Sequence, residues 1–226
     1  MSRLLFTVVL LAMLASSAFA VLPDKDEPQR TLVLIRHGEY DSDDESDPDV
    51  GRHLVTLGKQ QARLVAARLR AMPIEWTSIQ ASAMSRARET GAIIAEYFPG
   101  LELAIHRDIR ECTPTTRRED IMADLEEGEA AECEANLNAA WDRLFVPAAG
   151  DEDEFDIVVC HGNVIRWFVT RVLDVDPEAW LGMSIANCSM TTVQVRADGS
   201  VKLIAFADSG HIPYEMTTYP GTKAPQ

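Results

Sequence analysis

The chain has 226 residues, of which 46% are hydrophobic and 25% are charged, and these proportions are ordinary for one globular domain with a sizeable core. Its formal net charge is −15 at pH 7, and its isoelectric point is near 4.7. Because so acidic a chain repels the phosphate backbone of nucleic acids, we expect no nucleic-acid partner. Any site for an anion must gather the few positive groups at one place.

The first twenty residues resemble a secretory signal peptide. Arg3 precedes an apolar run over residues 4–14, and the triplet Ala-Phe-Ala at 18–20 fits the A-x-A site that signal peptidase reads. The run is shorter than the roughly 20 residues that a membrane span needs. We therefore expect residues 1–20 to be cleaved and the protein to be secreted or exported. The alternative is an uncleaved anchor over residues 4–22, which would tether the chain to a membrane.

Residues 21–30 are polar and are predicted to be a linker, residues 31–214 the domain, and residues 215–226 a C-terminal tail. The domain opens with a short, apolar, β-branched run at 31–35, and a matching run lies at 155–160. Apolar runs without alternation are typical of strands that are covered on both faces, as in a parallel sheet.

Helical patterns with good helix formers occupy residues 56–72, 85–98, 129–145 and 163–173, with Thr56 placed to cap the first. Strands and helices thus alternate, which indicates an α/β fold. Near the C-terminus, two β-rich runs at 191–196 and 201–206 flank an Asp-Gly pair, the strongest short hairpin signal. We expect this antiparallel hairpin to complete the sheet.

No pattern in the sequence predicts a metal site or a disulfide framework. The four cysteines, at 112, 133, 160 and 188, form no C-x-x-C and no metal-ligand spacing, and Cys160 ends an apolar run, as a small buried hydrophobe would. The acidic run at 41–49 does not fit a calcium loop, since Ser46 and Arg52 stand where Gly and Glu are required. We interpret it as a solvated loop.

Both buried strands run into a histidine that is followed by glycine, His37 after the first strand and His161 after the second. In open α/β sheets ligands bind outside the carboxyl ends of the strands, so the two histidines are predicted to face one pocket. The glycines allow the backbone to approach a ligand closely. A single histidine is more often structural, but two in matched positions indicate a functional site.

The sequence around His37, Arg-His-Gly-Glu at 36–39, resembles the R-H-G-E signature of the histidine phosphatase superfamily. Residues 82–90 resemble its S-x-x-x-R-A-x-E-T segment, in which we interpret Ser82 and Thr90 as structural. Glu111 and His161 follow in the family's order, and the likeness runs from residue 31 to about 213. It implies a phosphoglycerate-mutase-like fold, with three layers α/β/α, a mostly parallel central sheet and an antiparallel C-terminal hairpin.

Within the superfamily, Tyr40 and the segments 161–166 and 180–191 are most similar to the mitochondrial, phosphoglycerate-mutase-like serine/threonine-protein phosphatases. The Trp-Asn pair that follows the signature in phosphoglycerate mutases is absent, and the acidic loop stands there instead. This departure argues against mutase activity.

The resemblance implies a phosphatase that needs no metal and no other cofactor. Its catalytic residues would be His37 as nucleophile, Glu111 as the acid and base, and three groups that bind the phosphoryl oxygens, Arg36, Arg86 and His161. Asn163 would either donate a further hydrogen bond to the substrate or cap the helix that begins there, and capping is the favoured interpretation.

Three functions stay open on the sequence. The first is a phosphatase that acts on phosphoserine or phosphothreonine in proteins, and the second is a broad-specificity phosphatase for small phosphomonoesters. The third is a non-catalytic phosphate-binding module, which would be expected to lose the nucleophile or the acid. The sequence carries no signal for an oligomeric state.

Overall fold

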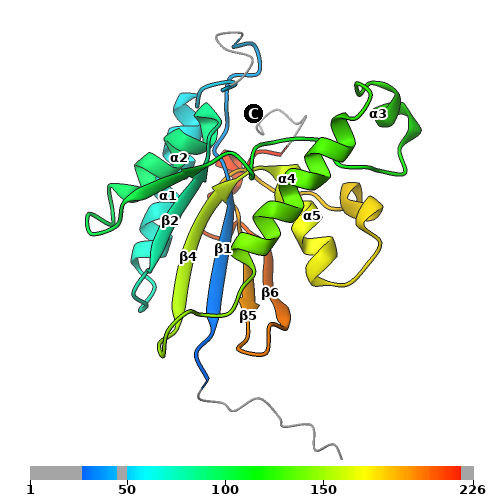
Figure 1. The fold of residues 1–226 in the computed structure, drawn as a ribbon. Helices are drawn as coiled ribbons and strands as arrows, with labels where there is room; N and C mark the ends of the chain where they lie inside the picture. Colours follow the sequence, from blue (N-terminus) through cyan, green and yellow to red (C-terminus); the bar gives the residue numbers. More distant parts are fainter. Residues whose placement is uncertain (1–26, 45–49, 220–226) are drawn as a thin grey trace, which may run out of the picture.

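The computed structural model describes residues 27–44 and 50–219, which form one α/β domain around a six-stranded sheet (Figure 1). The predicted signal peptide and residues 45–49 of the acidic run lie outside the described residues. In the part of the chain that is described, no helix is both long and apolar enough to span a membrane.

The sheet is mostly parallel, in the order β3-β2-β4-β1-β5-β6. Strand β1 pairs in parallel with β4 and antiparallel with β5, which forms a hairpin with β6. The strands are β1 (Arg30–Arg36), β2 (Ser78–Ser82), β3 (Leu103–His106), β4 (Glu154–Cys160), β5 (Met190–Val195) and β6 (Val201–Asp208). The α/β class, the parallel centre and the C-terminal hairpin are therefore confirmed. Strands β2 and β3 were not predicted, because they are short and mix polar with apolar residues.

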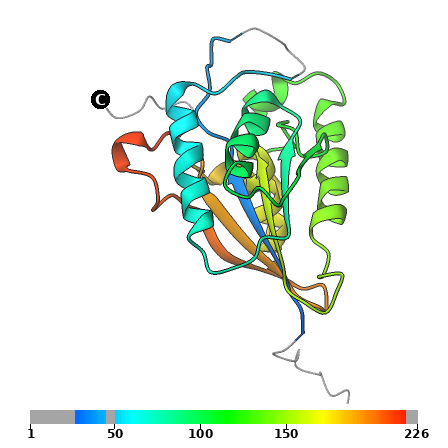
Figure 2. The same ribbon diagram turned by 90° about the vertical axis from the view of Figure 1, so that its left-hand side faces the viewer.

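Helices cover both faces of the sheet, as Figure 2 shows with the sheet between them. The helices are α1 (Thr56–Arg70), α2 (Ser85–Ala95), α3 (Glu119–Ala123), α4 (Glu129–Leu144) and α5 (Gly162–Val172), and two short 3₁₀ helices lie at Pro177–Gly182 and Tyr214–Met216. On β1, Leu32 and Leu34 pack with α4 and α5, while Val33 and Ile35 pack with α1 and α2. This two-sided burial explains why the strand is apolar without alternation.

The two expected helix caps are wrong. Thr56 is the first residue of α1, whose N-cap is Val55 and carries no side-chain cap. In α5 the N-cap is His161, so Asn163 lies inside the helix, where its side chain bonds to other partners. Both helices start where long-range contacts hold the chain: Val55 N–H donates to Glu39 O at 3.2 Å, and His161 is anchored by its own ring.

The cysteine spacing indicated no disulfide framework and left the pairing open, and in the structure Cys112 and Cys133 are joined, with their Cα atoms 5.6 Å apart. The two cysteines are 21 residues apart in sequence, and they meet only because the loop after β3 folds against α4. Cys160 is a free, buried cysteine, as its place at the end of an apolar run predicted.

The predicted C-terminal tail is packed against the domain as far as it is described. Thr218 is buried, and its hydroxyl donates to Asn187 Oδ1 at 3.0 Å. Asn187 in turn donates to the carbonyl oxygen of His37 at 2.9 Å. The packed part of the chain thus extends beyond residue 214 and supports the residues at the end of β1.

Candidate active site

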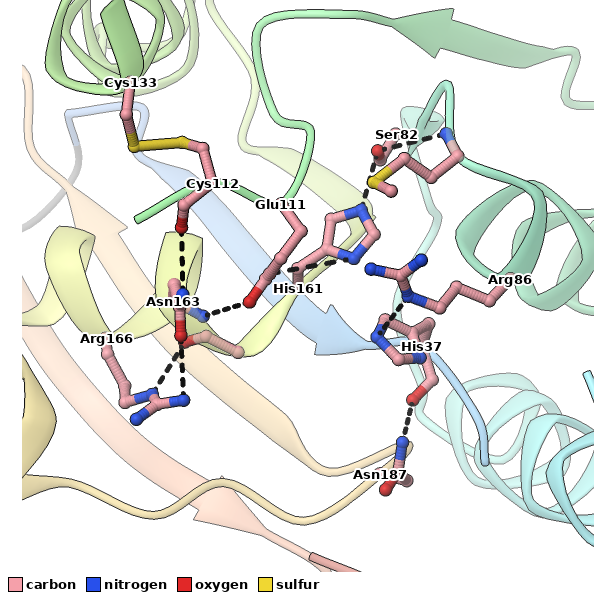
Figure 3. A network of polar contacts seen from close by, with 12 residues as sticks. His37, Ser82, Arg86, Glu111, Cys112, Cys133, His161, Asn163, Arg166 and Asn187 are labelled. Carbon is pink, nitrogen blue, oxygen red and sulfur yellow. Dashed lines mark hydrogen bonds and ion pairs between the residues drawn. A yellow bond between two sulfur atoms is a disulfide. The ribbon is translucent and has the colours of Figure 1, made fainter. Parts of the chain in front are cut away.

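Two histidines meet at the carboxyl ends of the central strands. Arg36 at the end of β1 lies opposite Cys160 at the end of β4, and His37 N–H donates to Cys160 O at 3.0 Å. This register places the rings of His37 and His161 with their centroids 5.0 Å apart (Figure 3). The two histidines therefore lie side by side at the strand ends, as the two matched motifs predicted.

His37 is held as a neutral imidazole whose Nε2 lone pair faces Arg86. Its Nδ1 lies 2.8 Å from Gly38 O, and because a carbonyl can only accept, Nδ1 carries the proton. Nε2 is then unprotonated and accepts from Arg86 Nε at 3.0 Å. Burial lowers the pKa of His37 well below its usual value, and the neighbouring His161, Arg36 and Arg86 lower it further. The ring has the form that a nucleophile requires.

His161 is held in the opposite sense, with a proton directed at the pocket. Its Nε2 lies 2.8 Å from Ser82 Oγ, which also accepts from Met84 N–H at 3.4 Å. The serine hydroxyl can therefore donate to Nε2, which leaves the ring proton on Nδ1. Burial lowers the pKa of this imidazole well below its usual value, and Arg86 and Arg36 add to the effect. Neutral His161 is a hydrogen-bond donor for a bound anion.

Three buried polar atoms around this pocket have no hydrogen-bond partner: Arg36 Nε, His161 Nδ1 and Glu111 Oε2. The last two lie 3.8 Å apart, and Arg36 Nε is 3.6 Å from the point that a Cβ on Gly162 would occupy. Buried polar groups in folded proteins are nearly always paired, so a cluster of unpaired ones indicates a place for a ligand. The two nitrogens, Arg36 Nε and His161 Nδ1, are donors that suit an oxyanion.

Three arginines supply the positive charge of the site in an otherwise acidic protein. Arg36 is buried and donates through Nη1 to Ile185 O at 2.6 Å, which fixes the orientation of its guanidinium group. Arg86, in the first turn of α2, has its guanidinium 4.9 Å from the centre of the Tyr40 ring. Arg166 extends from α5 and is half-buried. Burial lowers the pKa of Arg36 and Arg86, and the Glu111 carboxylate partly offsets this change.

Glu111 reaches the pocket from the irregular segment after β3. Its Oε1 accepts from Asn163 N–H at 3.3 Å, and its side chain is 27% exposed. Burial of the carboxyl group raises the pKa of Glu111, although Arg86 and Arg36 oppose the change. A raised pKa favours the protonated form of the carboxyl group, which is the form that can give a proton to a leaving group.

The structure thus brings together the five residues that were expected to be catalytic. Asn163 differs, because its side-chain amide bonds to Cys112 O and Arg166, and it reaches Glu111 through its main-chain N–H. Sequence reasoning assigned no role at the site to Ser82 or Arg166. Ser82 lies at the carboxyl end of β2, so prediction of that strand would have placed it at the same edge of the sheet.

The lowered pKa values of His37 and His161 predict that the protein loses stability in mild acid. Below pH 6.5 the two histidines are protonated in the unfolded chain but stay neutral in the folded chain. Each unit by which the pH is lowered therefore decreases the free energy of unfolding by about 1.4 kcal/mol for each such proton. Above this pH both states are neutral and the two residues contribute no slope. Urea titrations from pH 8 to 5 should show a shallower slope for His37→Ala than for wild type, and parallel curves would contradict the prediction.

Comparison of the chain with protein families gives a match to the model of the histidine phosphatase superfamily (branch 1), over residues 32–143 and 115–206. The chain is 36% identical over 193 residues to the mitochondrial serine/threonine-protein phosphatase Pgam5 of Caenorhabditis briggsae. The matched region covers 83% of this chain and 66% of that protein. The chain is also 35% identical over 194 residues to PGAM5 of Xenopus laevis, with 84% and 70% covered. The chain spans about two thirds of the length of these relatives.

Solved structures of the same fold include a phosphoglycerate mutase from Plasmodium falciparum, with a TM-score of 0.59, 29% identity and coverage of 85% of this chain and 99% of the other. A phosphoserine phosphatase from Entamoeba histolytica has a TM-score of 0.60 and 22% identity, with 81% and 100% covered. These similarities confirm the phosphoglycerate-mutase-like fold.

The expectation of a secreted or exported protein is wrong, because the relatives at about 35% identity are named as mitochondrial proteins. That expectation rested on an apolar run and small residues near the N-terminus, outside the described residues. Such a pattern reports only the length and the flanks of an apolar segment.

Proposed function

Because the chain belongs to the histidine phosphatase superfamily, branch 1, we propose that it hydrolyses phosphomonoesters through a phosphohistidine intermediate on His37. The observation that carries this proposal is the set of three unpaired buried atoms, Arg36 Nε, His161 Nδ1 and Glu111 Oε2, beside the lone pair of the His37 ring. Two of them are donors for phosphoryl oxygens, and the third is an acid for the leaving group.

In the first step, the substrate phosphoryl group takes the place of Arg86 Nε at His37 Nε2, and the freed guanidinium turns its donors to the phosphoryl oxygens. The Nε2 lone pair forms the P–N bond as the P–O bond to the alcohol breaks. Glu111, in its protonated form, gives its proton to the departing oxygen. His37 Nδ1 keeps its proton and donates it in a hydrogen bond to Gly38 O throughout, so the ring stays oriented.

In the second step, the Glu111 carboxylate takes a proton from water, and the resulting nucleophile attacks phosphorus as the P–N bond breaks. Inorganic phosphate leaves, His37 Nε2 regains its lone pair, and Glu111 is again protonated. In both steps the negative charge on the equatorial oxygens is stabilised by Arg36, Arg86 and His161, so the mechanism needs no other cation. In the described residues, no group of three or more His, Cys, Asp or Glu side chains is arranged to hold a metal ion.

We further propose that the substrates are phosphoserine and phosphothreonine in proteins. Support comes from the relatives, which are named serine/threonine-protein phosphatases and resemble the chain over most of its length. The surroundings of Glu111 are compatible with a bulky leaving group, since this residue borders an open cavity of about 480 Å³ with Arg107, Arg110, Glu129 and Glu132 on its walls. A macromolecule can reach such an opening.

The experiment is a hydrolysis assay of the purified chain, with EDTA present, on phosphoserine and phosphothreonine peptides and on a panel of small phosphomonoesters. We expect hydrolysis of the peptides without added metal, and an acid-labile phosphoenzyme after rapid denaturation. Turnover of the small esters alone would assign a small-molecule phosphatase. Phosphate binding without turnover of any ester would assign a non-catalytic module, and activity that a divalent ion restores after EDTA would refute the metal-free mechanism.

A further inference from the structure

The segment that carries Glu111 is fastened immediately after that residue by two different elements. Cys112 is bonded through its sulfur to Cys133 in α4. Its carbonyl oxygen accepts from Asn163 Nδ2 in α5 at 2.9 Å. Figure 3 shows both connections beside Glu111. The backbone next to the acid is therefore attached covalently to one helix and by a hydrogen bond to another.

Asn163 contacts the loop that carries Glu111 at two points, once at Glu111 and once at Cys112, and Arg166 fixes the orientation of its amide. The main-chain N–H of Asn163 donates to Glu111 Oε1, while its side chain holds the next residue of the loop. Arg166 donates through Nη2 to Asn163 Oδ1 at 2.9 Å and through Nε to Gly162 O at 3.1 Å. Because the oxygen of the amide is engaged by Arg166, its nitrogen is the end that faces Cys112.

These contacts matter because, among the described residues, the carboxyl group of Glu111 accepts a hydrogen bond from Asn163 N–H alone. The residue lies in a stretch without helix or strand, and its Oε2 has no hydrogen-bond partner. A displacement of about 1 Å in a catalytic group can cost about 100-fold in rate. An acid on an irregular segment therefore needs fixed neighbours, and Cys112 and Asn163 supply them.

We propose that Asn163 and the Cys112–Cys133 disulfide are positioning groups that hold Glu111 at the phosphoryl pocket, so that breaking the disulfide selectively slows the step that needs the acid. The proposal rests on the proposed function of Glu111. Both cysteines line the open cavity beside Glu111, and Cys112 is partly exposed, which gives a small thiol a route to the sulfurs.

The test begins with reduction of the wild-type protein by a dithiol such as dithiothreitol. The dithiol gives two electrons and two protons, its own sulfurs join, the Cys112–Cys133 bond breaks, and both residues become thiols. Single-turnover rates are then measured on a phosphoserine peptide, whose alkoxide leaving group needs a proton, and on nitrophenyl phosphate, whose leaving group does not. We expect reduction to lower the peptide rate about 10-fold or more and the nitrophenyl phosphate rate much less.

Two variants serve as matched controls. Cys133→Ala should show the low peptide rate from the start, with no further response to the dithiol. Asn163→Ala should show the same selective loss with the disulfide intact, while wild type, reduced or oxidised, keeps its circular dichroism spectrum. Equal losses for both substrates, or an unchanged ratio in reduced wild type, would overturn the positioning role. An oxidised wild type that hydrolyses neither substrate would overturn the proposed function itself.

Discussion

Replacing His37 with alanine is expected to lower turnover by roughly 10⁴- to 10⁶-fold, the loss that removal of a covalent nucleophile causes. His161 cannot take over, because its Nε2 is engaged with Ser82 and its Nδ1 carries the proton that faces the pocket. Steady-state kinetics on a phosphoserine peptide measures the effect. The fold should stay intact, since among residues 27–44 and 50–219 the ring makes hydrogen bonds to Gly38 and Arg86 only.

A matched control for this variant is His53→Ala. His53 is an exposed histidine whose ring contacts Glu89 and which has no place in the proposed chemistry, so its removal should leave turnover unchanged. Circular dichroism of both variants checks the fold. If His37→Ala keeps more than a few per cent of the wild-type activity, the nucleophile is another residue.

Glu111→Gln is expected to separate substrates by their leaving groups. A serine alkoxide leaves poorly and needs a proton in the transition state, whereas a nitrophenolate leaves readily without one. Phosphorylation of His37 by a phosphoserine peptide should therefore slow by roughly 10²- to 10⁴-fold, and by nitrophenyl phosphate much less. Glutamine has the shape of glutamate and can keep the hydrogen bond from Asn163 N–H, so the loss reports the missing proton.

Because Glu111 also activates water in the second step, steady-state rates would fall for both substrates and hide this difference. Rapid-quench kinetics resolves the two steps. The variant should release a burst of nitrophenol equal to the enzyme present and then turn over slowly as phosphohistidine accumulates.

The matched control is Glu132→Gln, which changes an exposed carboxylate on the wall of the same cavity and should keep fast turnover after the burst. Equal single-turnover losses for both substrates in Glu111→Gln, or no loss for either, would remove Glu111 from the role of acid. Glu39 and Asp208 would then be the carboxylates to test.

Much of the fold and the centre of the site were predictable from the sequence because they depend on local patterns. The apolar runs at 31–35 and 155–160 are buried on both faces, and burial on two faces is what removes the alternation of polar residues. Each run ends in a histidine and a glycine, so the strand ends alone placed His37 and His161 at one edge of the sheet. The Asp-Gly pair likewise predicted the turn between β5 and β6, where Gly199 has a φ of 80°.

The remaining features depend on which segments pack together, and only the tertiary structure decided them. The disulfide, the two contacts of Asn163 with the Glu111 loop and the bond from Ser82 to His161 each join residues that are 21 to 79 positions apart. Cysteine spacing cannot show that a loop folds against α4, and helix-capping preference is outweighed when Cys112 O and Arg166 offer the Asn163 amide better partners. The sequence thus predicts which residues lie at the strand ends, while tertiary packing decides which groups orient them.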